Sequence, residues 1–375
     1  MSIPFNKPYL SGKETEYIKD AVLGGKISGD GLYTKKCHDF FEKKYEFKKV
    51  LLTTSCTDAL EMAAILLDIK EGDEVIIPSY TFVSTVNAFV LRGAKIVFAD
   101  SGKSNPNMDV ETIEPLITSK TKAIVPVHYA GIACDMNKIM ELANKYNLFV
   151  VEDAAQAIDS YFHGRSLGSI GHMAAFSFHE TKNIISGEGG MLAINDEQFS
   201  KRAEIIREKG TNRSAFFRGE VDKYGWVDIG SSFLPSEIIA AFLFAQIENI
   251  ENIQNRRKKI WNIYNDQLKS LESLGIQLPF TPDGATNNAH MYYMVCRSLT
   301  ERSALIKHLK ELDINAVFHY LSLHKSPFYK DKHDGRVLIN SDHYSDCLLR
   351  LPMYYELTDE QVLKISLAIL DFYKN

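Results

Sequence analysis

The sequence lacks the features that mark membrane proteins, disulfide-rich secreted proteins and nucleic-acid-binding proteins. No run reaches about 18 consecutive apolar residues, and the first residues show no basic segment followed by an apolar one, so we expect neither a membrane span nor a signal peptide. The five cysteines are odd in number and scattered without metal-type spacing, which favours reduced thiols. The net charge of −5 gives no reason to expect nucleic acid as a partner. These absences predict a cytoplasmic protein without a metal site.

Internal repeats and low-complexity segments are also absent, and the chain instead alternates between two patterns. Apolar, β-rich runs alternate with helix-like runs between residues 74 and 152, and 110–117 is one of the predicted helices. Such alternation predicts an α/β fold with a mainly parallel sheet. A long helical pattern begins near Pro235. We therefore expect a large domain, 1–247, followed by a smaller C-terminal α+β domain, 248–375.

The segment around Lys182 carries the first chemical signal. The apolar run 173–178 reads as a strand, and Lys182 then stands in a polar turn that ends in the glycine cluster 187–190. Desolvation lowers the pKa of a lysine held between buried strands, and its neutral amine can hold an aldehyde as a Schiff base. The glycines let the chain turn sharply beside a flat ligand. The alternative is a loop lysine beside an ordinary glycine turn.

A second signal is the carboxylate of Asp153, which follows the apolar run 148–152. Parallel strands deliver such side chains to the carboxyl edge of the sheet, where ligands bind. At that edge Asp153 is suitably placed to pair with a protonated pyridine nitrogen, the partner that pyridoxal phosphate (PLP) requires as an electron sink. Alternatively, Asp153 caps a helix. The combination of Asp153 and Lys182 favours the PLP site.

Small hydroxyl residues between the strand-like run 51–53 and the helix-like run 59–67 form a third signal. Backbone amides and hydroxyl groups at the start of a helix bind anions, so this turn suits a phosphate. An ordinary helix cap is the alternative.

Three segments together resemble the signature of the DegT/StrS family of PLP-dependent sugar aminotransferases: Glu152-Asp-x-Ala-Gln156, Ser177-Phe-His-x-x-Lys182-Asn and Gly187-Glu-Gly-Gly190. The resemblance extends from Ile3 to the segment Leu351-Pro-Met-Tyr and so covers essentially the whole chain. It implies the fold type I of PLP-dependent transferases, with a mixed, mainly parallel sheet between helices. It also implies a homodimer whose active site lies at the subunit interface.

The resemblance assigns roles to the candidate site residues. Lys182 would bind PLP and move a proton between substrate and cofactor, and Asp153 would pair with the pyridine nitrogen. The other implied cofactor contacts are those of Cys56, Thr57 and Ser177 with the phosphate, of Phe82 and Ala155 with the two ring faces, and of Gln156 with the 3′ oxygen.

The chain departs from the family's pattern at Gly230-Ser-Ser232-Phe-Leu234, where many members carry Gly-Tyr-Asn-Tyr-Arg. Ser232 replaces the asparagine that commonly reaches the partner subunit's phosphate. A serine hydroxyl would make this contact directly or through water.

Two further segments are candidates for substrate binding. The polar and aromatic segment 211–226, which includes Arg213, is long enough to be a functional loop and suits a nucleotide diphosphate. His319 and Tyr320 resemble the family's His-Tyr motif, which faces the sugar nucleotide. Alternatively, His319 is a polar core residue.

The resemblance implies conversion of dTDP-4-keto-6-deoxyglucose to dTDP-4-amino-4,6-dideoxygalactose, with L-glutamate as amino donor, in the synthesis of lipopolysaccharide or another surface polysaccharide. Three alternatives stay open. The product could be the C4 epimer (4-amino-4,6-dideoxyglucose), the acceptor could be a 3-keto nucleotide sugar, or the protein could be a PLP-binding regulator. The family's sugar dehydratases carry histidine in place of Lys182, so the lysine argues against dehydration.

Overall fold

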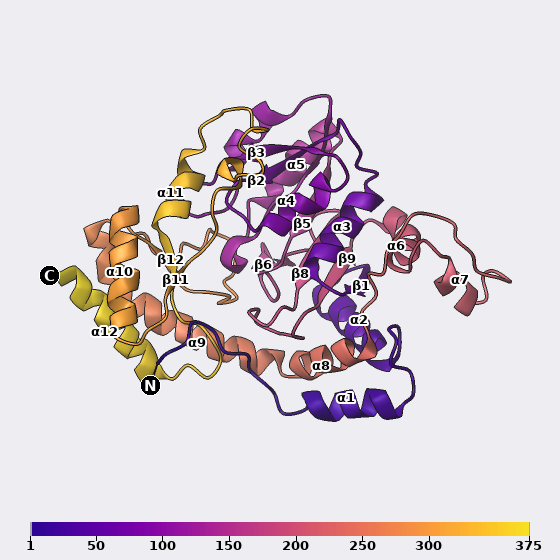
Figure 1. Cartoon of the computed structure of the whole chain (residues 1–375), viewed down its shortest axis with the longest axis horizontal. Coiled ribbons are helices and arrows are strands. Elements are labelled where there is room, and N and C mark those ends of the chain that lie inside the picture. Colours follow the sequence, from indigo (N-terminus) through magenta and orange to yellow (C-terminus); the bar gives the residue numbers. More distant parts are fainter. Residues whose placement is uncertain (1, 375) are drawn as a thin grey trace.

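The computed structural model describes residues 2–374, and its centre is a seven-stranded sheet with the order β1-β9-β8-β5-β4-β2-β3 (Figure 1). Only β9 runs opposite to the other strands, since it pairs antiparallel with both β1 and β8. The prediction of an α/β fold with a mainly parallel, mixed sheet is therefore confirmed. The bounds of the strands are β1 Lys49–Thr53, β2 Glu74–Pro78, β3 Lys95–Ala99, β4 Thr121–Ile124, β5 Phe149–Asp153, β8 Met173–Ser177 and β9 Gly190–Ile194.

Helices cover both faces of this sheet because the strands bury apolar side chains on both sides. In β1, Val50 and Leu52 pack into the cluster that includes α1, α2, α5 and α8, whereas Leu51 packs into the cluster that includes α3, α4 and α6. The bounds of these helices are α1 Glu14–Leu23, α2 Leu32–Tyr45, α3 Cys56–Leu66, α4 Val83–Val90, α5 Met136–Tyr146, α6 Ser200–Arg207 and α8 Glu237–Glu248.

The prediction of a helix at 110–117 is wrong. Two short 3₁₀ turns, Val110–Thr112 and Glu114–Leu116, occupy this segment. Pro115 lacks a backbone N–H and disfavours the α conformation of the residue before it, so the apolar spacing does not produce an α-helix here.

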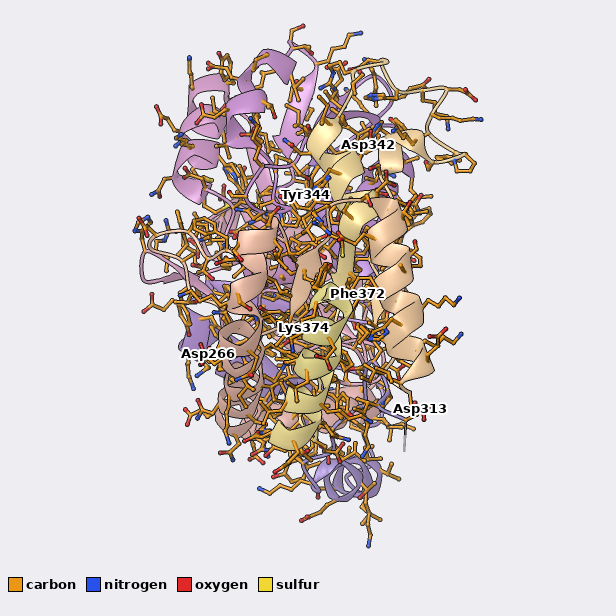
Figure 2. All side chains as sticks on the ribbon, turned by 90° about the vertical axis from the view of Figure 1, so that its left-hand side faces the viewer. Asp266, Asp313, Asp342, Tyr344, Phe372 and Lys374 are labelled. Atoms are coloured by element: carbon orange, nitrogen blue, oxygen red, sulfur yellow. The ribbon has the colours of Figure 1, made fainter. Side chains whose placement is uncertain are left out.

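The C-terminal part surrounds a three-stranded antiparallel sheet with the order β10-β12-β11. Figure 2 shows α12, which carries Phe372 and Lys374, between α9, which carries Asp266, and α10. Neither β12 nor α11 was predicted from the sequence. The bounds are α9 Ile250–Leu268, β10 Tyr293–Val295, α10 Leu299–Glu311, β11 Val317–Phe318, α11 Ile339–Cys347, β12 Leu348–Arg350 and α12 Asp359–Lys374.

Two smaller features lie outside these layers. A hairpin of β6, Tyr161–Phe162, and β7, Arg165–Ser166, follows β5. The short helix α7, Arg213–Phe217, lies on a segment that extends away from the sheet, at the right of Figure 1. Within residues 2–374, no helix combines the length and apolar character needed to cross a membrane. The domain boundary at 247/248 stays a prediction; α8 ends at Glu248 and α9 begins at Ile250.

Candidate active site

Lys182 lies in the turn that connects β8 with β9. Its backbone N–H donates to the carbonyl of His179 at 2.9 Å, and the side chains of Asn183 and Ile184 that follow are buried. The Nζ atom has no hydrogen-bond or ion-pair partner within residues 2–374. Burial lowers the pKa of Lys182, while the negative charge of Asp153 acts in the opposite direction. The amine is therefore free to react and loses its proton more easily than that of an exposed lysine.

Asp153 is buried at the carboxyl end of β5, the neighbour of β8 in the sheet. One carboxylate oxygen, Oδ2, accepts a hydrogen bond from Oγ1 of Thr85 at 2.6 Å, and Oδ1 accepts one from the N–H of Ala155 at 3.1 Å. Burial raises the pKa of Asp153, against the lowering effect of these hydrogen bonds and of the charge of Lys182. No helix begins directly after β5, so Asp153 is not a helix cap.

A cluster of hydroxyl groups lies at the start of α3, near the ends of β8 and β9. Oγ1 of Thr57 donates to Oγ of Ser84 at 2.8 Å, and Oγ of Ser177 accepts from the N–H of His179 at 3.4 Å. A Cβ atom on Gly190 would come within 2.4 Å of the backbone nitrogen of Cys56, so glycine is needed for β9 to approach α3 this closely. Ser55 caps this helix, since its Oγ accepts a hydrogen bond from the N–H of Asp58 at 3.0 Å, so the ordinary cap is present. Binding of a phosphate at this helix start stays a prediction.

The residues implied to contact the cofactor ring lie around Gln156. Its Oε1 accepts a hydrogen bond from the N–H of Ala130 at 2.6 Å, and its Nε2 donates to the hydroxyl of Tyr320 at 2.9 Å. The rings of Tyr320 and Phe82 lie 6.0 Å apart, and Phe82 keeps 55% of its surface exposed. Ala155 is half-buried. The structure thus brings Tyr320 from the C-terminal part to two residues of the predicted cofactor site.

His319 packs beside Tyr320 at the same site. The two rings stack with their centroids 3.6 Å apart, and Nδ1 of His319 forms a hydrogen bond with the hydroxyl of Tyr129 at 2.7 Å. Burial lowers the pKa of His319 well below its usual value, and the positive charges of Arg350 and Lys182 act in the same direction. His319 is therefore neutral at physiological pH.

Ser232 and Arg213 do not join this cluster within the chain. Ser232 is exposed and its backbone pairs with Glu208. Arg213 lies on α7, with its guanidinium 5.1 Å from the ring centre of Phe217 and 4.0 Å from Oε1 of Glu208. The carbonyl of Phe233, the residue after Ser232, accepts a hydrogen bond from the N–H of Thr54 at 3.0 Å. Roles for Ser232 and Arg213 at a cofactor or substrate stay predictions.

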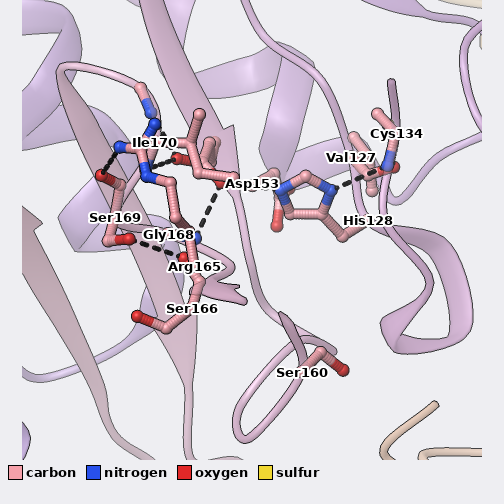
Figure 3. Close-up of polar contacts among 12 residues, drawn as sticks. Val127, His128, Cys134, Asp153, Ser160, Arg165, Ser166, Gly168, Ser169 and Ile170 are labelled. Carbon is pink, nitrogen blue, oxygen red and sulfur yellow. Dashed lines mark hydrogen bonds and ion pairs between the residues drawn. The ribbon is translucent and has the colours of Figure 1, made fainter. Parts of the chain in front are cut away.

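The sequence did not reveal the buried pair of Glu152 and His128. Figure 3 shows His128 together with Asp153, the residue after Glu152. Glu152 accepts hydrogen bonds from Nε2 of His128 at 2.8 Å and from the N–H groups of Gly168 and Gly171. Strand alternation turns Glu152 away from the face that carries Asp153.

Thr85 and Arg350 were also missed. Thr85 lies in the first turn of α4, and only its hydrogen bond to Asp153 shows that it belongs to the site. Arg350 ends the unpredicted strand β12, yet its charge contributes to the lowered pKa of Lys182. Both residues come from segments whose sequence pattern carries no chemical signal.

The arrangement fits PLP. Lys182 offers a free amine for the aldehyde, Asp153 offers a buried carboxylate for the pyridine nitrogen, and the start of α3 offers N–H and hydroxyl groups for the phosphate. When bound, PLP supplies an electron sink for bond changes at a substrate carbon.

Known proteins resemble this chain over nearly its full length. A family model described as the DegT/DnrJ/EryC1/StrS aminotransferase family matches residues 8–370. The GDP-perosamine synthase of Escherichia coli O157:H7 is 33% identical over 377 residues, which cover 100% of this chain and 99% of that protein. The spore coat polysaccharide biosynthesis protein SpsC of Bacillus subtilis (strain 168) is 30% identical over 381 residues, covering 99% of this chain and 97% of that protein.

A solved structure shows the same fold. The putative sugar aminotransferase Spr1654 from Streptococcus pneumoniae, in its PMP form, has a TM-score of 0.91 at 26% identity and 99% coverage of both chains. Its PLP form has a TM-score of 0.90 at the same identity, covering 100% of this chain and 99% of that one. The expected fold type and cofactor are therefore confirmed.

Proposed function

This chain belongs to the DegT/DnrJ/EryC1/StrS aminotransferase family and is a PLP-dependent sugar aminotransferase, and from that premise we propose its substrates. The acceptor is dTDP-4-keto-6-deoxyglucose, the amino donor is L-glutamate, and the product is dTDP-4-amino-4,6-dideoxygalactose. The whole-chain resemblance to dTDP-4-amino-4,6-dideoxygalactose transaminase supports this choice. We also propose that the enzyme is cytoplasmic and serves the synthesis of a surface polysaccharide, a role that the name of its relative SpsC supports.

The observation that carries the catalytic assignment is the free amine of Lys182 beside the buried carboxylate of Asp153. Lys182 would hold the aldehyde of PLP until the amino donor displaces it. The released amine would then carry the proton between substrate carbon and cofactor carbon, and its lowered pKa suits this task. Asp153 would keep the pyridine nitrogen protonated through its negative charge. Cys56, Thr57 and Ser177 would hold the phosphate.

The acceptor sugar would meet the face that His319 and Tyr320 present. Tyr320 reaches Gln156, so a sugar held by the tyrosine would lie beside the residue proposed to bind the 3′ oxygen of PLP. The neutral imidazole of His319 can donate or accept a hydrogen bond with a sugar hydroxyl, depending on its tautomer. Gln156 would thus link recognition of sugar and cofactor.

We further propose a homodimer in which the segment 211–230 of one subunit completes the site of the other. This segment exposes large apolar side chains, with Trp226 83% and Phe217 69% accessible in the single chain. Exposed aromatic groups of this kind mark protein interfaces. Arg213 on this segment would meet the diphosphate, and Ser232 just after it would meet the phosphate of PLP.

A second candidate acceptor is a GDP-linked keto sugar, which the similarity to GDP-perosamine synthase favours. The C4 epimer of the product and a 3-keto acceptor are the remaining alternatives. None of them changes the proposed roles of Lys182 and Asp153, because the acceptor's nucleotide and the orientation of its sugar ring are read by other residues.

The test incubates the enzyme with PLP, L-glutamate and one acceptor at a time: the 4-keto or the 3-keto dTDP-6-deoxy sugar, or the GDP-linked 4-keto sugar. NMR of the purified product identifies the aminated carbon and the orientation of the nitrogen. We expect an axial amino group at C4 of the dTDP sugar. Amination only of the 3-keto isomer or only of the GDP sugar would contradict the proposed acceptor, and an equatorial nitrogen would contradict the proposed product.

A further inference from the structure

Arg350, the last residue of β12, forms no ion pair with any of residues 2–374. Its Nη2 lies 3.4 Å from the carbonyl of Phe318, and its guanidinium lies 4.7 Å from the ring centre of Phe5. The Nε atom is shielded from solvent and has no hydrogen-bond partner, although the side chain as a whole is only partly buried. A guanidinium presents its donors in a fixed fork that matches a carboxylate. The contacts of Arg350 within residues 2–374 therefore leave several of its N–H donors available for a ligand.

In the part of the chain that the structure describes, the interactions that shift the pKa of Arg350 include no carboxylate. The titratable groups that act on it are the hydroxyls of Tyr129, Tyr320 and Tyr80, and burial lowers its pKa. By contrast, the buried Arg207 pairs with Asp30 at 2.6 Å. A partly desolvated cation is costly unless an anion meets it. These features suit Arg350 to bind an anionic ligand.

This cation lies near the turn that carries the reacting amine. Its guanidinium lies over the ring of Phe5, and the next residue, Asn6, donates from Nδ2 to the carbonyl of Glu180 at 3.3 Å, two residues before Lys182. Burial is the main cause of the lowered pKa of Lys182 and of His290, and the charge of Arg350 lowers both further. The charges of Lys182 and Arg257 also contribute to the lowered pKa of His290. Lys182 thus interacts with the positive charge of Arg350 and with the negative charge of Asp153. An anion placed between Arg350 and Lys182 would be attracted by both.

We propose that Arg350 binds the α-carboxylate of the amino donor, an inference that rests on the proposed function. In an amino acid the carboxylate is bonded to the carbon that bears the reacting nitrogen, so it must lie near Lys182 during transfer. In a nucleotide sugar, by contrast, the diphosphate is attached at C1, across the ring from the reacting C4. An anion site that interacts with Lys182 therefore suits the amino acid better than the diphosphate.

The two half-reactions provide the test, because each can be followed separately by the absorption of the bound cofactor. In Arg350→Gln the PLP form should react with L-glutamate with an apparent Kd raised roughly tenfold or more, the loss expected for a charge-assisted hydrogen bond. The PMP form should react with the keto sugar as in the wild type. The matched control is Arg302→Gln, which removes an arginine whose guanidinium lies 5.6 Å from the ring centre of Phe318, and it should change neither half-reaction.

Donor analogues test the same contact without depending on one variant. The wild type should prefer L-glutamate over L-isoglutamine, whose α-carboxylate is an amide, and this preference should collapse in Arg350→Gln and be partly kept in Arg350→Lys. Glutarate, which has no amine and cannot react, should bind the wild-type holoenzyme more tightly than Arg350→Gln in calorimetry. A wild type that accepts both donors equally would overturn the proposal even if the variants fail to fold.

Other outcomes are equally informative. A defect confined to the sugar half-reaction would assign Arg350 to the diphosphate, and an equal defect in both halves would assign it a structural role; either result overturns the proposal. Because the donor half-reaction needs no sugar, its outcome is independent of which nucleotide sugar is the acceptor. Failure of the proposed acceptor is thus distinguishable from failure of the Arg350 assignment.

Discussion

At Lys182 and Asp153, burial and charge act against each other. Burial favours the neutral forms of both groups, which lowers the pKa of the lysine and raises that of the aspartate. The opposite charge on each neighbour partly restores ionisation. A bound pyridinium would take over the role of the cation beside Asp153, so the lysine can remain neutral and reactive while the carboxylate stays charged.

Lys182→Ala should abolish covalent retention of PLP, because no other amine is proposed to hold the aldehyde. Borohydride reduction followed by peptide mass spectrometry should find the cofactor on a Lys182 peptide in the wild type and on none in the variant. Lys201→Ala, which removes an exposed lysine of α6, serves as control and should keep the adduct. A reduced adduct in Lys182→Ala at wild-type occupancy would show that another lysine binds PLP.

Thr85→Val tests the hydroxyl that holds Asp153. The variant keeps the side-chain shape but loses the 2.6 Å hydrogen bond to the carboxylate, a contact of about 1.5–3 kcal/mol, so turnover should fall roughly tenfold or more. This bond also lowers the pKa of Asp153. Its loss raises that pKa, and the acid limb of the pH–rate profile should shift to higher pH.

Thr81→Val is the matched control for this shift. Thr81 forms a hydrogen bond with Thr85 but not with Asp153, so the acid limb should move little. Equal shifts in the two variants would indicate a general disturbance of the site instead of a direct effect on the carboxylate.

At the scale of elements, strand β5 serves two purposes through neighbouring residues. Asp153 faces the proposed cofactor site, whereas Glu152 points to the other face and fastens the turn before β8 through the N–H groups of Gly168, Ile170 and Gly171. Burial alone would raise the pKa of Glu152, but the hydrogen bonds from His128 and these amides lower it below its usual value. The ionised carboxylate therefore stabilises the edge of the sheet that holds Asp153.

Glu152→Gln should lower the free energy of unfolding by at least about 1.5 kcal/mol, since hydrogen bonds to a charged acceptor are lost or weakened. The folded pKa is depressed, so this contribution is fully present above the usual pKa of 4.5 and disappears as the pH falls through the folded value. Urea midpoints should thus differ at pH 7 and converge at acidic pH. Glu114→Gln, at an exposed ion pair with Lys145, should leave the midpoint unchanged.

The elements also show what could be read from the sequence. Buried strands of a parallel sheet are continuous apolar runs, and the strand predicted at 173–178 is observed as β8 with nearly the same bounds. The segment 110–117 misled because its apolar spacing was helical while Pro115 prevented a helix. The three residues of β12 were too few for a periodic signal, so Arg350 was missed. Contacts between distant segments, such as Thr85 with Asp153, depend on the fold and leave no local pattern.

At the scale of the whole molecule, two exposed features fit the proposed homodimer. Phe82, proposed to stack on the cofactor ring, is 55% exposed, and the segment with Trp226 extends from the body without a large contact of its own (Figure 1). Both exposures would be removed if the segment of one subunit covered the site of another. A symmetric dimer would then contain two equivalent sites, each built from both chains.

Mixed dimers of two inactive variants provide the test of this arrangement. Lys182→Ala lacks the reactive amine, and Ser232→Asp would place a carboxylate against the partner subunit's phosphate, where like charges repel. If Lys182 and Ser232 serve one site from different subunits, a mixed dimer contains one site with both residues intact. Random mixing after mild dissociation should then restore activity at roughly a quarter of all sites, although each variant alone is inactive.

The matched control mixes Lys182→Ala with Asp153→Asn. The structure places Lys182 and Asp153 in the same chain at one site, so every mixed dimer has one site lacking the lysine and one lacking the aspartate, and no activity should return. Recovery in the first mixture and not in the second would locate Ser232 in the partner's site. An absence of recovery in both, while light scattering shows that mixed dimers form, would contradict the shared site and place the effect of Ser232 within its own chain.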